Sequence, residues 1–186
     1  MDYAPEPELT QPAAPPAAEA ATRAHARPFD LWVIAIIVLA DQATKLLVRQ
    51  LLPQGHSVSV IPGLLDLTHV QNTGAAFGIL NAADFPFKGL VMTAIAAVAL
   101  VAIAMYAAQL AAHERIARLG LALILGGALG NLVDRARSGF VVDFVDVYWG
   151  TTHFWAFNVA DASITAGAAL VILEMLGLGR HASRTV

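Results

Sequence analysis

The stretch 89–111, GLVMTAIAAVALVAIAMYAAQLA, decides the fold class of this chain. It is longer than the ~20 residues that a helix needs to cross the hydrocarbon core of a bilayer. From Leu90 to Leu110 it carries no charge. The whole chain agrees with a membrane protein, because it is 58% hydrophobic and 13% charged, with a mean hydropathy of +0.64. We therefore expect an all-α membrane protein.

Three further apolar stretches of similar length lie on either side of this segment. They cover residues 30–51, 118–137 and 156–178. Together with 89–111 they predict four transmembrane helices within a single domain, 29–178. An even number of spans puts both termini on one side, and the arginines near the span ends favour the cytoplasm for that side. Those arginines are Arg23, Arg27, Arg115, Arg118, Arg180 and Arg184.

The two ends of the chain differ from this domain in composition. Residues 1–28 are rich in alanine and proline and have little apolar surface to bury, so a disordered cytoplasmic tail is predicted. A secretory signal peptide fits less well, because Asp41 and Lys45 follow the apolar run where a small-residue cleavage site is needed. Residues 179–186 are expected to form a second cytoplasmic tail.

The segment between the first two spans indicates a small extracytoplasmic β-hairpin. Apolar and polar residues alternate over 57–61 and over 65–70, and Pro62-Gly63 supplies a turn between them. Two aromatic segments, 84–87 and the loop 138–155, are expected to lie at the membrane interface. The loop joins the third and fourth spans on the outward side of the membrane.

Polar residues within the apolar stretches gather at the outward end of the predicted bundle. Alternating topology also places Asp143, in the loop 138–155, at that end. Charged groups inside a membrane are costly and usually mark function. The pairs Asp41–Lys45 and Asp134–Arg135 could also be ion pairs that only fix helix packing. The polar residues of the spans are Asp41, Lys45, Asn131, Asp134, Arg135, Asn158 and Asp161.

Asp143 and Asp161 have no basic neighbour in the sequence that would explain them as ion pairs. Two carboxyl groups held close together share a proton, so that one stays protonated while the other stays ionised. The ionised group can take a proton from water, and the protonated group can donate to a scissile carbonyl. This chemistry is typical of aspartic peptidases.

Other chemistries lack the residues they need. The chain has no cysteine, and its six histidines show no zinc-ligand spacing, so neither a metal nor another cofactor is expected. A net charge of −3 without a basic cluster gives no reason to expect a nucleic-acid partner. Ser163 is interpreted as a packing residue, and the small residues 126–130 as a close helix contact. His56, His69 and His153 are expected on the polar outer surface.

Five blocks of the sequence are similar to the signature blocks of lipoprotein signal peptidases, also called signal peptidases II. They are DQATK (41–45), NTGAAFG (72–78), GGALGNLVDR (126–135), VVDF (141–144) and FNVAD (157–161). They occur in the family's order, and the resemblance covers about 29–178. Only the N-terminal tail falls outside it.

The resemblance implies a monomeric endopeptidase of the bacterial inner membrane with its active site facing the periplasm. Its substrates would be prolipoproteins that carry diacylglycerol, cleaved just before the lipidated cysteine, and globomycin-type compounds and membrane lipids would also bind. Asp143 and Asp161 match the catalytic pair. Asp134 matches a structural position that does not contact the substrate directly. The hairpin and outer loop match a cradle and a loop over the active site. Substrate-binding or supporting positions are matched by Asp41, Lys45, Asn72, Gly74, Asn131, Arg135, Phe157, Asn158 and Ala160.

Two other functions stay open on the residues alone. Intramembrane carboxylates also build proton relays in transporters, although here they gather at one end instead of crossing the bilayer. The polar cluster could also hold together a scaffold without catalysis. Each asparagine could bind the substrate backbone, orient the aspartates, or only satisfy the carbonyls of a helix end.

Overall fold

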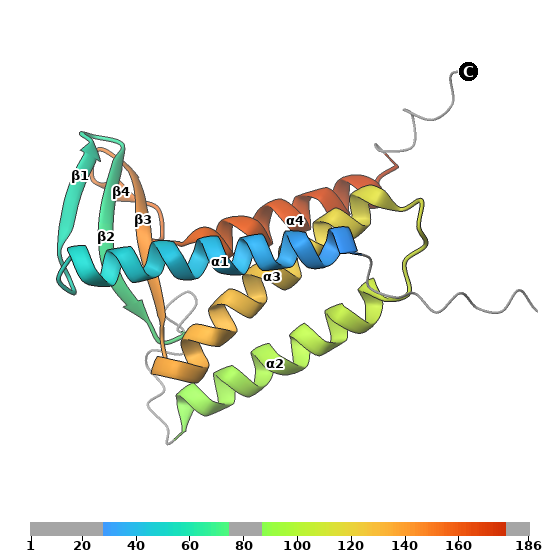
Figure 1. Cartoon of the computed structure of the whole chain (residues 1–186). Coiled ribbons are helices and arrows are strands. Elements are labelled where there is room, and N and C mark those ends of the chain that lie inside the picture. Colours follow the sequence, from blue (N-terminus) through green and yellow to red (C-terminus); the bar gives the residue numbers. More distant parts are fainter. Residues whose placement is uncertain (1–27, 75–86, 178–186) are drawn as a thin grey trace, which may run out of the picture.

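The computed structural model describes residues 28–74 and 87–177 (Figure 1). Residues 1–27 and 179–186 of the predicted tails, and residues 84–86, lie outside the described residues. Pro28, which was assigned to the N-terminal tail, is instead the first residue of a helix. Helices occur at α1 (Pro28–Leu51), α2 (Lys88–Ala107), α3 (Arg115–Ser138) and α4 (Val159–Met175). Strands occur at β1 (Ser57–Ile61), β2 (Leu65–Asn72), β3 (Val141–Trp149) and β4 (Thr152–His153).

Three of these helices are long and apolar enough to cross a membrane, namely Asp30–Leu51, Gly89–Ala107 and Arg115–Ser138. The last helix, α4, has 17 residues and is shorter than these three. It begins at Val159 and not at the predicted residue 156, because Asn158 is its N-cap. The backbone of Asn158 is extended, and its side chain accepts a hydrogen bond from the Asp161 N–H. This bond caps the N-terminus of the helix, which therefore starts at the next residue.

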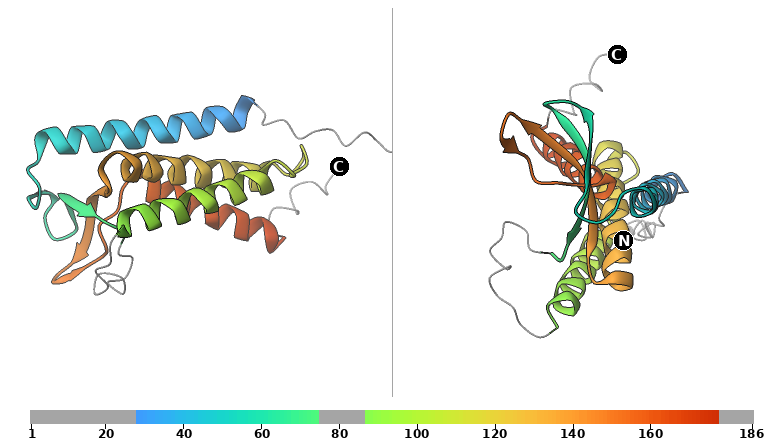
Figure 2. Two further views of the ribbon diagram at one scale, coloured as in Figure 1. Left: turned by 90° about the horizontal axis from the view of Figure 1, so that it is seen from below. Right: turned by 90° about the vertical axis from the view of Figure 1, so that its left-hand side faces the viewer.

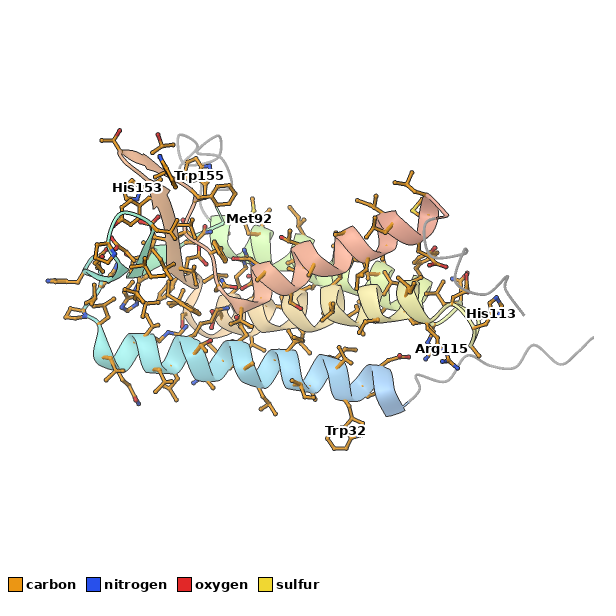
Figure 3. The ribbon with its side chains drawn as sticks, turned by 90° about the horizontal axis from the view of Figure 1, so that it is seen from above. Trp32, Met92, His113, Arg115, His153 and Trp155 are labelled. Carbon is orange, nitrogen blue, oxygen red and sulfur yellow. The ribbon has the colours of Figure 1, made fainter. Side chains whose placement is uncertain are left out.

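The outer faces of the helices are covered by apolar side chains. Val98 of α2 is 71% exposed and Leu39 of α1 is 69% exposed. Figure 3 shows Trp32 pointing away from the helix bundle. A soluble protein rarely carries so continuous an apolar surface, whereas lipid is an apolar solvent for it. The described chain is therefore a membrane protein of helices with a small antiparallel sheet.

Helix α3 is the central helix and packs against α1, α2 and α4 (Figure 2). Its glycines allow the close approach that was predicted for 126–130. A Cβ atom on Gly127 would lie 2.3 Å from the carbonyl oxygen of Ala160, so no larger residue fits there without a shift of α4. Ser163 donates to the carbonyl of Leu123 at 2.9 Å, as expected for a packing residue.

The four strands form one antiparallel sheet in the order β1-β2-β3-β4 at one end of the bundle (Figure 1). The hairpin predicted over 57–61 and 65–70 is confirmed, and β2 continues to Asn72. The interpretation of 138–155 as an interfacial loop missed β3. This strand is rich in valines and aromatic residues, which favour strands, and it pairs with β2. Val142 in it is completely buried.

One surface prediction is wrong. His69 is only 6% exposed, because β2 turns its ring toward the end of α1, where Nδ1 lies 2.8 Å from the carbonyl oxygen of Leu52. His56 and His153 are exposed, as predicted. Figure 3 places His153 and Trp155 at the sheet end of the molecule, opposite His113 and Arg115.

Candidate active site

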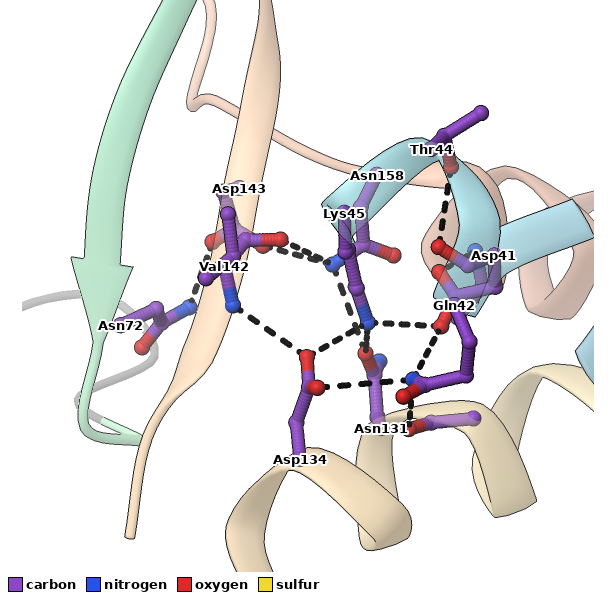
Figure 4. A network of polar contacts seen from close by, with 12 residues as sticks. Asp41, Gln42, Thr44, Lys45, Asn72, Asn131, Asp134, Val142, Asp143 and Asn158 are labelled. Carbon is purple, nitrogen blue, oxygen red and sulfur yellow. Dashed lines mark hydrogen bonds and ion pairs between the residues drawn. The ribbon is translucent and has the colours of Figure 1, made fainter. Parts of the chain in front are cut away.

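The polar residues that were predicted to converge meet at the sheet end of the bundle (Figure 4). Helices α1 and α3 supply charged side chains and Asn131, β2 supplies Asn72, and β3 supplies Asp143. Asp161 lies in the first turn of α4. Five elements of the chain therefore build one polar site where the sheet meets the helices.

Asp143 is almost fully buried, with 2% of its surface exposed. Its Oδ1 accepts from the side-chain amide of Asn158 at 2.7 Å, and its Oδ2 accepts from that of Asn72 at 3.0 Å. Burial raises the pKa of Asp143 to about 6, and the nearby charge of Asp161 adds to the rise. The two asparagine bonds oppose the shift because they favour the ionised form.

Asp161 lies in a different environment. Its Oδ1 accepts from the side chain of Asn131 at 2.8 Å, and its Oδ2 accepts from the backbone N–H of Asn158 at 3.3 Å. It is partly exposed and lies at the N-terminus of α4, where the helix dipole favours a negative charge. Neither Asp143 nor Asp161 forms an ion pair with a basic side chain in 28–74 or 87–177.

The three asparagines are fixed so that each turns its NH2 group toward a carboxyl group. A donor occupies the Oδ1 atom of each one, which prevents the amide from flipping. These donors are the Gly74 N–H on Asn72 at 2.9 Å, the Lys45 Nζ on Asn131 at 2.9 Å and the Asp161 N–H on Asn158 at 3.0 Å. The geometry favours asparagines that orient the two aspartates, with Asn158 also serving as a helix cap.

A cluster of buried charges lies directly behind this site. Lys45 Nζ is 2.8 Å from Asp41 and 3.0 Å from Asp134, and Arg49 is 2.9 Å from Asp134. Of the two ion pairs considered possible from the sequence, Asp41–Lys45 is present, whereas Asp134 pairs with Lys45 and Arg49 and not with Arg135. Successive residues of a helix point about 100° apart, so Arg135 cannot share the direction in which Asp134 meets α1.

Two members of this cluster were missed by sequence reasoning. Arg49 follows Lys45 by four residues, as Lys45 follows Asp41, so all three lie on one face of α1, and this spacing was the available signal. Gln42 donates to the Asp41 carboxylate and to the Gly130 carbonyl, both at 3.2 Å. Gln42 lies within the block 41–45 that carries the family resemblance, but nothing in that block assigned it a role.

The remaining predicted residues lie around the site in different ways. Ala160 is fully buried, and its N–H donates to Asp41 Oδ1 at 3.0 Å. The backbone of Phe157 pairs with Val145 of β3 and so joins the start of α4 to the strand that carries Asp143. Arg135 is partly exposed and forms no ion pair with a described carboxylate. Among the described residues no group of three histidine, cysteine or acidic side chains could hold a metal.

Comparison with known proteins identifies the family. The family described as Signal peptidase (SPase) II matches residues 33–177 of this chain. The chain belongs to the signal peptidase II family. Lipoprotein signal peptidases of this family process prolipoproteins by removing their signal peptides, so this chain is a membrane peptidase of lipoprotein processing.

Known lipoprotein signal peptidases and solved structures match this chain over nearly their whole length. The lipoprotein signal peptidase of Geobacter metallireducens is 44% identical over 152 residues, covering 82% of this chain and 93% of the relative. That of Geobacter sulfurreducens is 45% identical over 150 residues, covering 81% and 92%. Two solved bacterial membrane enzymes match with TM-scores of 0.68 and 0.71. Their identities are 30% and 32%, and the matches cover 80% and 85% of this chain, and 92% and 94% of theirs.

Proposed function

We propose that this signal peptidase II is an aspartic endopeptidase in which Asp143 and Asp161 cleave the peptide bond without a metal. The observation that carries the proposal is that Asn158 binds both carboxyl groups, through its side chain at 2.7 Å and its backbone N–H at 3.3 Å. Both groups receive hydrogen bonds from neutral donors, which leaves them free to exchange a proton with each other and with water.

The two environments favour different roles. Asp143 is buried and has a raised pKa, so it holds the shared proton and acts as the acid. Asp161 is partly exposed and lies at a helix N-terminus, whose dipole favours a negative charge, so we assign it the role of the base. Burial thus separates two residues of the same type into an acid and a base.

The reaction then proceeds in two steps. Asp161 takes a proton from water while the water oxygen attacks the carbonyl carbon, and Asp143 gives its proton to the carbonyl oxygen. The tetrahedral diol loses the peptide nitrogen as an amine when Asp161 returns its proton to that nitrogen. Asp143 recovers a proton from the diol as the new carboxyl group forms, so the proton balance closes.

The substrate proposed for this site is a prolipoprotein with diacylglycerol on its cysteine, cleaved just before that cysteine. A site at the end of apolar helices suits such a substrate, because the acyl chains stay in lipid while the peptide bond reaches the carboxyl groups. The sheet acts as a cradle for the peptide, and the segment after β3 covers it. Four spans in a single domain, 29–178, complete the proposed architecture.

The proposed orientation puts the sheet end in the periplasm and both termini in the cytoplasm of a bacterial inner-membrane monomer. The asparagines Asn72, Asn131 and Asn158 orient the carboxyl groups, and Gly74 fixes Asn72. Asp41, Lys45 and Asp134 support them from behind, while Arg135, Phe157 and Ala160 shape the rim and the backbone of the site. Globomycin-type inhibitors are expected to compete with the substrate.

A mobility-shift assay with a purified lipid-modified precursor tests this proposal. Asp143→Asn and Asp161→Asn should each abolish cleavage while the variants remain folded in detergent, and a chelator should leave the wild type active. Asp30→Asn is the matched control, because it removes the ion pair with Arg118 at the other end of α1 and α3. Cleavage by either folded aspartate variant would exclude the dyad, and loss of wild-type activity with chelator would exclude metal-free chemistry.

A further inference from the structure

Lys45 is a fully buried ammonium group that binds three acceptors. It has 0% of its surface exposed, and its Nζ lies 2.8 Å from Asp41 Oδ2, 3.0 Å from Asp134 Oδ2 and 2.9 Å from Asn131 Oδ1. An ammonium group has three N–H donors, so these bonds use its full capacity. The geometry of Lys45 therefore fixes the relative positions of one side chain on α1 and two on α3.

Two of these acceptors reach the residues that directly precede the proposed catalytic pair. Asp41 Oδ1 accepts from the N–H of Ala160 at 3.0 Å, and Ala160 precedes Asp161. Asp134 Oδ2 accepts from the N–H of Val142 at 3.4 Å, and Val142 precedes Asp143. Each carboxylate therefore joins the ammonium group to the backbone beside one member of the pair.

The third acceptor reaches Asp161 itself. Asn131 accepts from Lys45 with its Oδ1 and donates with its Nδ2 to Asp161 at 2.8 Å. Asp143 and Asp161 belong to separate elements, β3 and α4, and both are connected to Lys45 in this way. Figure 4 shows Lys45 between Asp41, Asp134 and Asn131.

We propose that Lys45 is a positioning residue that sets the spacing between Asp143 and Asp161 through Asp41, Asp134 and Asn131. This inference rests on the proposed function, since it assigns the spacing a catalytic purpose. Lys45 and Asp41 are too buried to touch a substrate, so they act only through the residues that they hold. Displacement of a catalytic group by about 1 Å can lower a rate on the order of 100-fold.

The charges of the cluster balance, which allows it to be buried. Asp41 and Asp134 carry two negative charges, and Lys45 and Arg49 carry two positive ones. Removal of one partner alone leaves a buried charge uncompensated, whereas removal of a complete pair is far better tolerated. This difference separates a loss of folding from a loss of positioning.

The chain provides a matched control for a purely structural ion pair. Asp30 and Arg118 also join α1 to α3, at the opposite end of the same two helices. Both side chains are partly buried, and their hydrogen bond is to each other. Asp30→Asn should therefore lower stability without affecting the spacing of the proposed pair.

The experiment compares Lys45→Met, the double variant Asp41→Asn/Lys45→Met and the control Asp30→Asn. The double variant removes both members of a pair and so leaves no new unpaired charge, which keeps the test valid if Lys45→Met does not fold. The measurements are thermal unfolding in detergent, kcat and KM on a lipid-modified precursor, and the pH dependence of kcat. All rates are expressed per folded enzyme.

For the double variant we expect kcat to fall on the order of 100-fold with little change in KM. The bell-shaped pH profile of kcat should also become narrower, because carboxyl groups that move apart influence each other's titration less. Asp30→Asn should keep the wild-type kcat and profile. A purely structural Lys45 would affect unfolding alone, so wild-type kcat and pH profile in the folded double variant would overturn the inference.

Failure of the proposed function gives a different result. If folded Asp143→Asn or Asp161→Asn still cleaves the precursor, the proposed dyad is wrong, and the Lys45 inference is overturned with it. If both aspartate variants are inactive while the double variant behaves as the wild type, only the positioning role of Lys45 is overturned.

Discussion

The side-chain amide of Asn158 donates to Asp143 at 2.7 Å and so connects the N-cap of α4 with strand β3. The same side chain caps the helix by accepting from the N–H of Asp161 at 3.0 Å. The side-chain oxygen of Asn158 thus stabilises the start of the helix, and its side-chain nitrogen orients Asp143. The two functions use different atoms, and substitution can separate them.

Asn158→Ser should preserve the cap but remove the donor to Asp143, since a serine oxygen is also a good N-cap acceptor. We expect stability close to that of the wild type with a kcat lower by on the order of 100-fold, because Asp143 loses one of its two orienting bonds. Asn158→Ala removes both bonds and should also destabilise the protein by about 1 kcal/mol. Thermal unfolding and kcat, measured together, check this; full activity of the serine variant would contradict it.

Substitution of Gly74 should lower both the activity and the stability of the protein. Its φ of +90° is strained for other residues, and a Cβ there would lie 3.3 Å from Met92 Cγ. Its N–H also holds the Oδ1 atom of Asn72, so Gly74→Ala should disturb the amide that binds Asp143. We expect destabilisation of about 1–3 kcal/mol and a loss of kcat.

Gly139→Ala is the matched control for that substitution. Gly139 also has a positive φ, +78°, but a Cβ there would meet nothing within 4 Å. This variant should lose stability and keep its kcat per folded enzyme. Equal kcat values for the two alanine variants would show that the Gly74–Asn72 bond does not orient the site.

The raised pKa of Asp143 predicts a pH dependence of stability. Its pKa in the folded protein is about 6, above its ordinary value of 3.8, so the folded state binds the proton more tightly than the unfolded chain. This contribution is fully present below the ordinary value and is lost as pH rises through about 6, by at most about 3 kcal/mol. Asp143→Asn should not show this loss.

Thermal unfolding of the wild type and Asp143→Asn at about pH 4 and about pH 7 measures the effect. The unfolding temperature of the wild type should fall relative to that of the variant between these two values. If the difference between the two unfolding temperatures is the same at both pH values, burial does not raise the pKa of Asp143.

The sheet contains two carboxylates in an unfavourable position. Asp66 of β2 is directly paired with Asp146 of β3, and one Oδ1 atom of each is buried without a partner among the described residues. The other carboxylate oxygen of Asp146 lies 2.9 Å from Nδ1 of His153. Like charges opposite each other weaken a sheet, so Asp66→Asn should stabilise the protein by about 0.2–1 kcal/mol. A lower unfolding temperature for this variant would contradict the interpretation.

Much of the fold follows from local patterns in the sequence. Apolar stretches of bilayer length predicted the helices, and alternation around Pro62-Gly63 predicted the hairpin. The start of α4 was misplaced by three residues because apolar content does not show which residue is the cap. Strand β3 was missed because its aromatic residues favour a membrane interface as strongly as a strand, and its pairing with β2 is a long-range contact.

The location of the site could be predicted from the sequence, whereas most of its ion pairs and hydrogen bonds could not. Alternating topology alone placed the polar residues at one end of the bundle. The partner of Asp134 was wrong because ion pairs between helices depend on rotation about the helix axis, which adjacent sequence positions do not reveal. The orientation of the three asparagine amides is likewise set by donors from other elements, such as Lys45 on Asn131.

Single-turnover cleavage of a lipid-modified precursor by Asp143→Asn, Asp161→Asn and the double variant tests the central claim most directly. Residues that act as one unit are not additive, so each single variant should lose about as much rate as the double variant. Losses that instead add up across the two positions, or a single variant that retains cleavage, would contradict a shared catalytic pair.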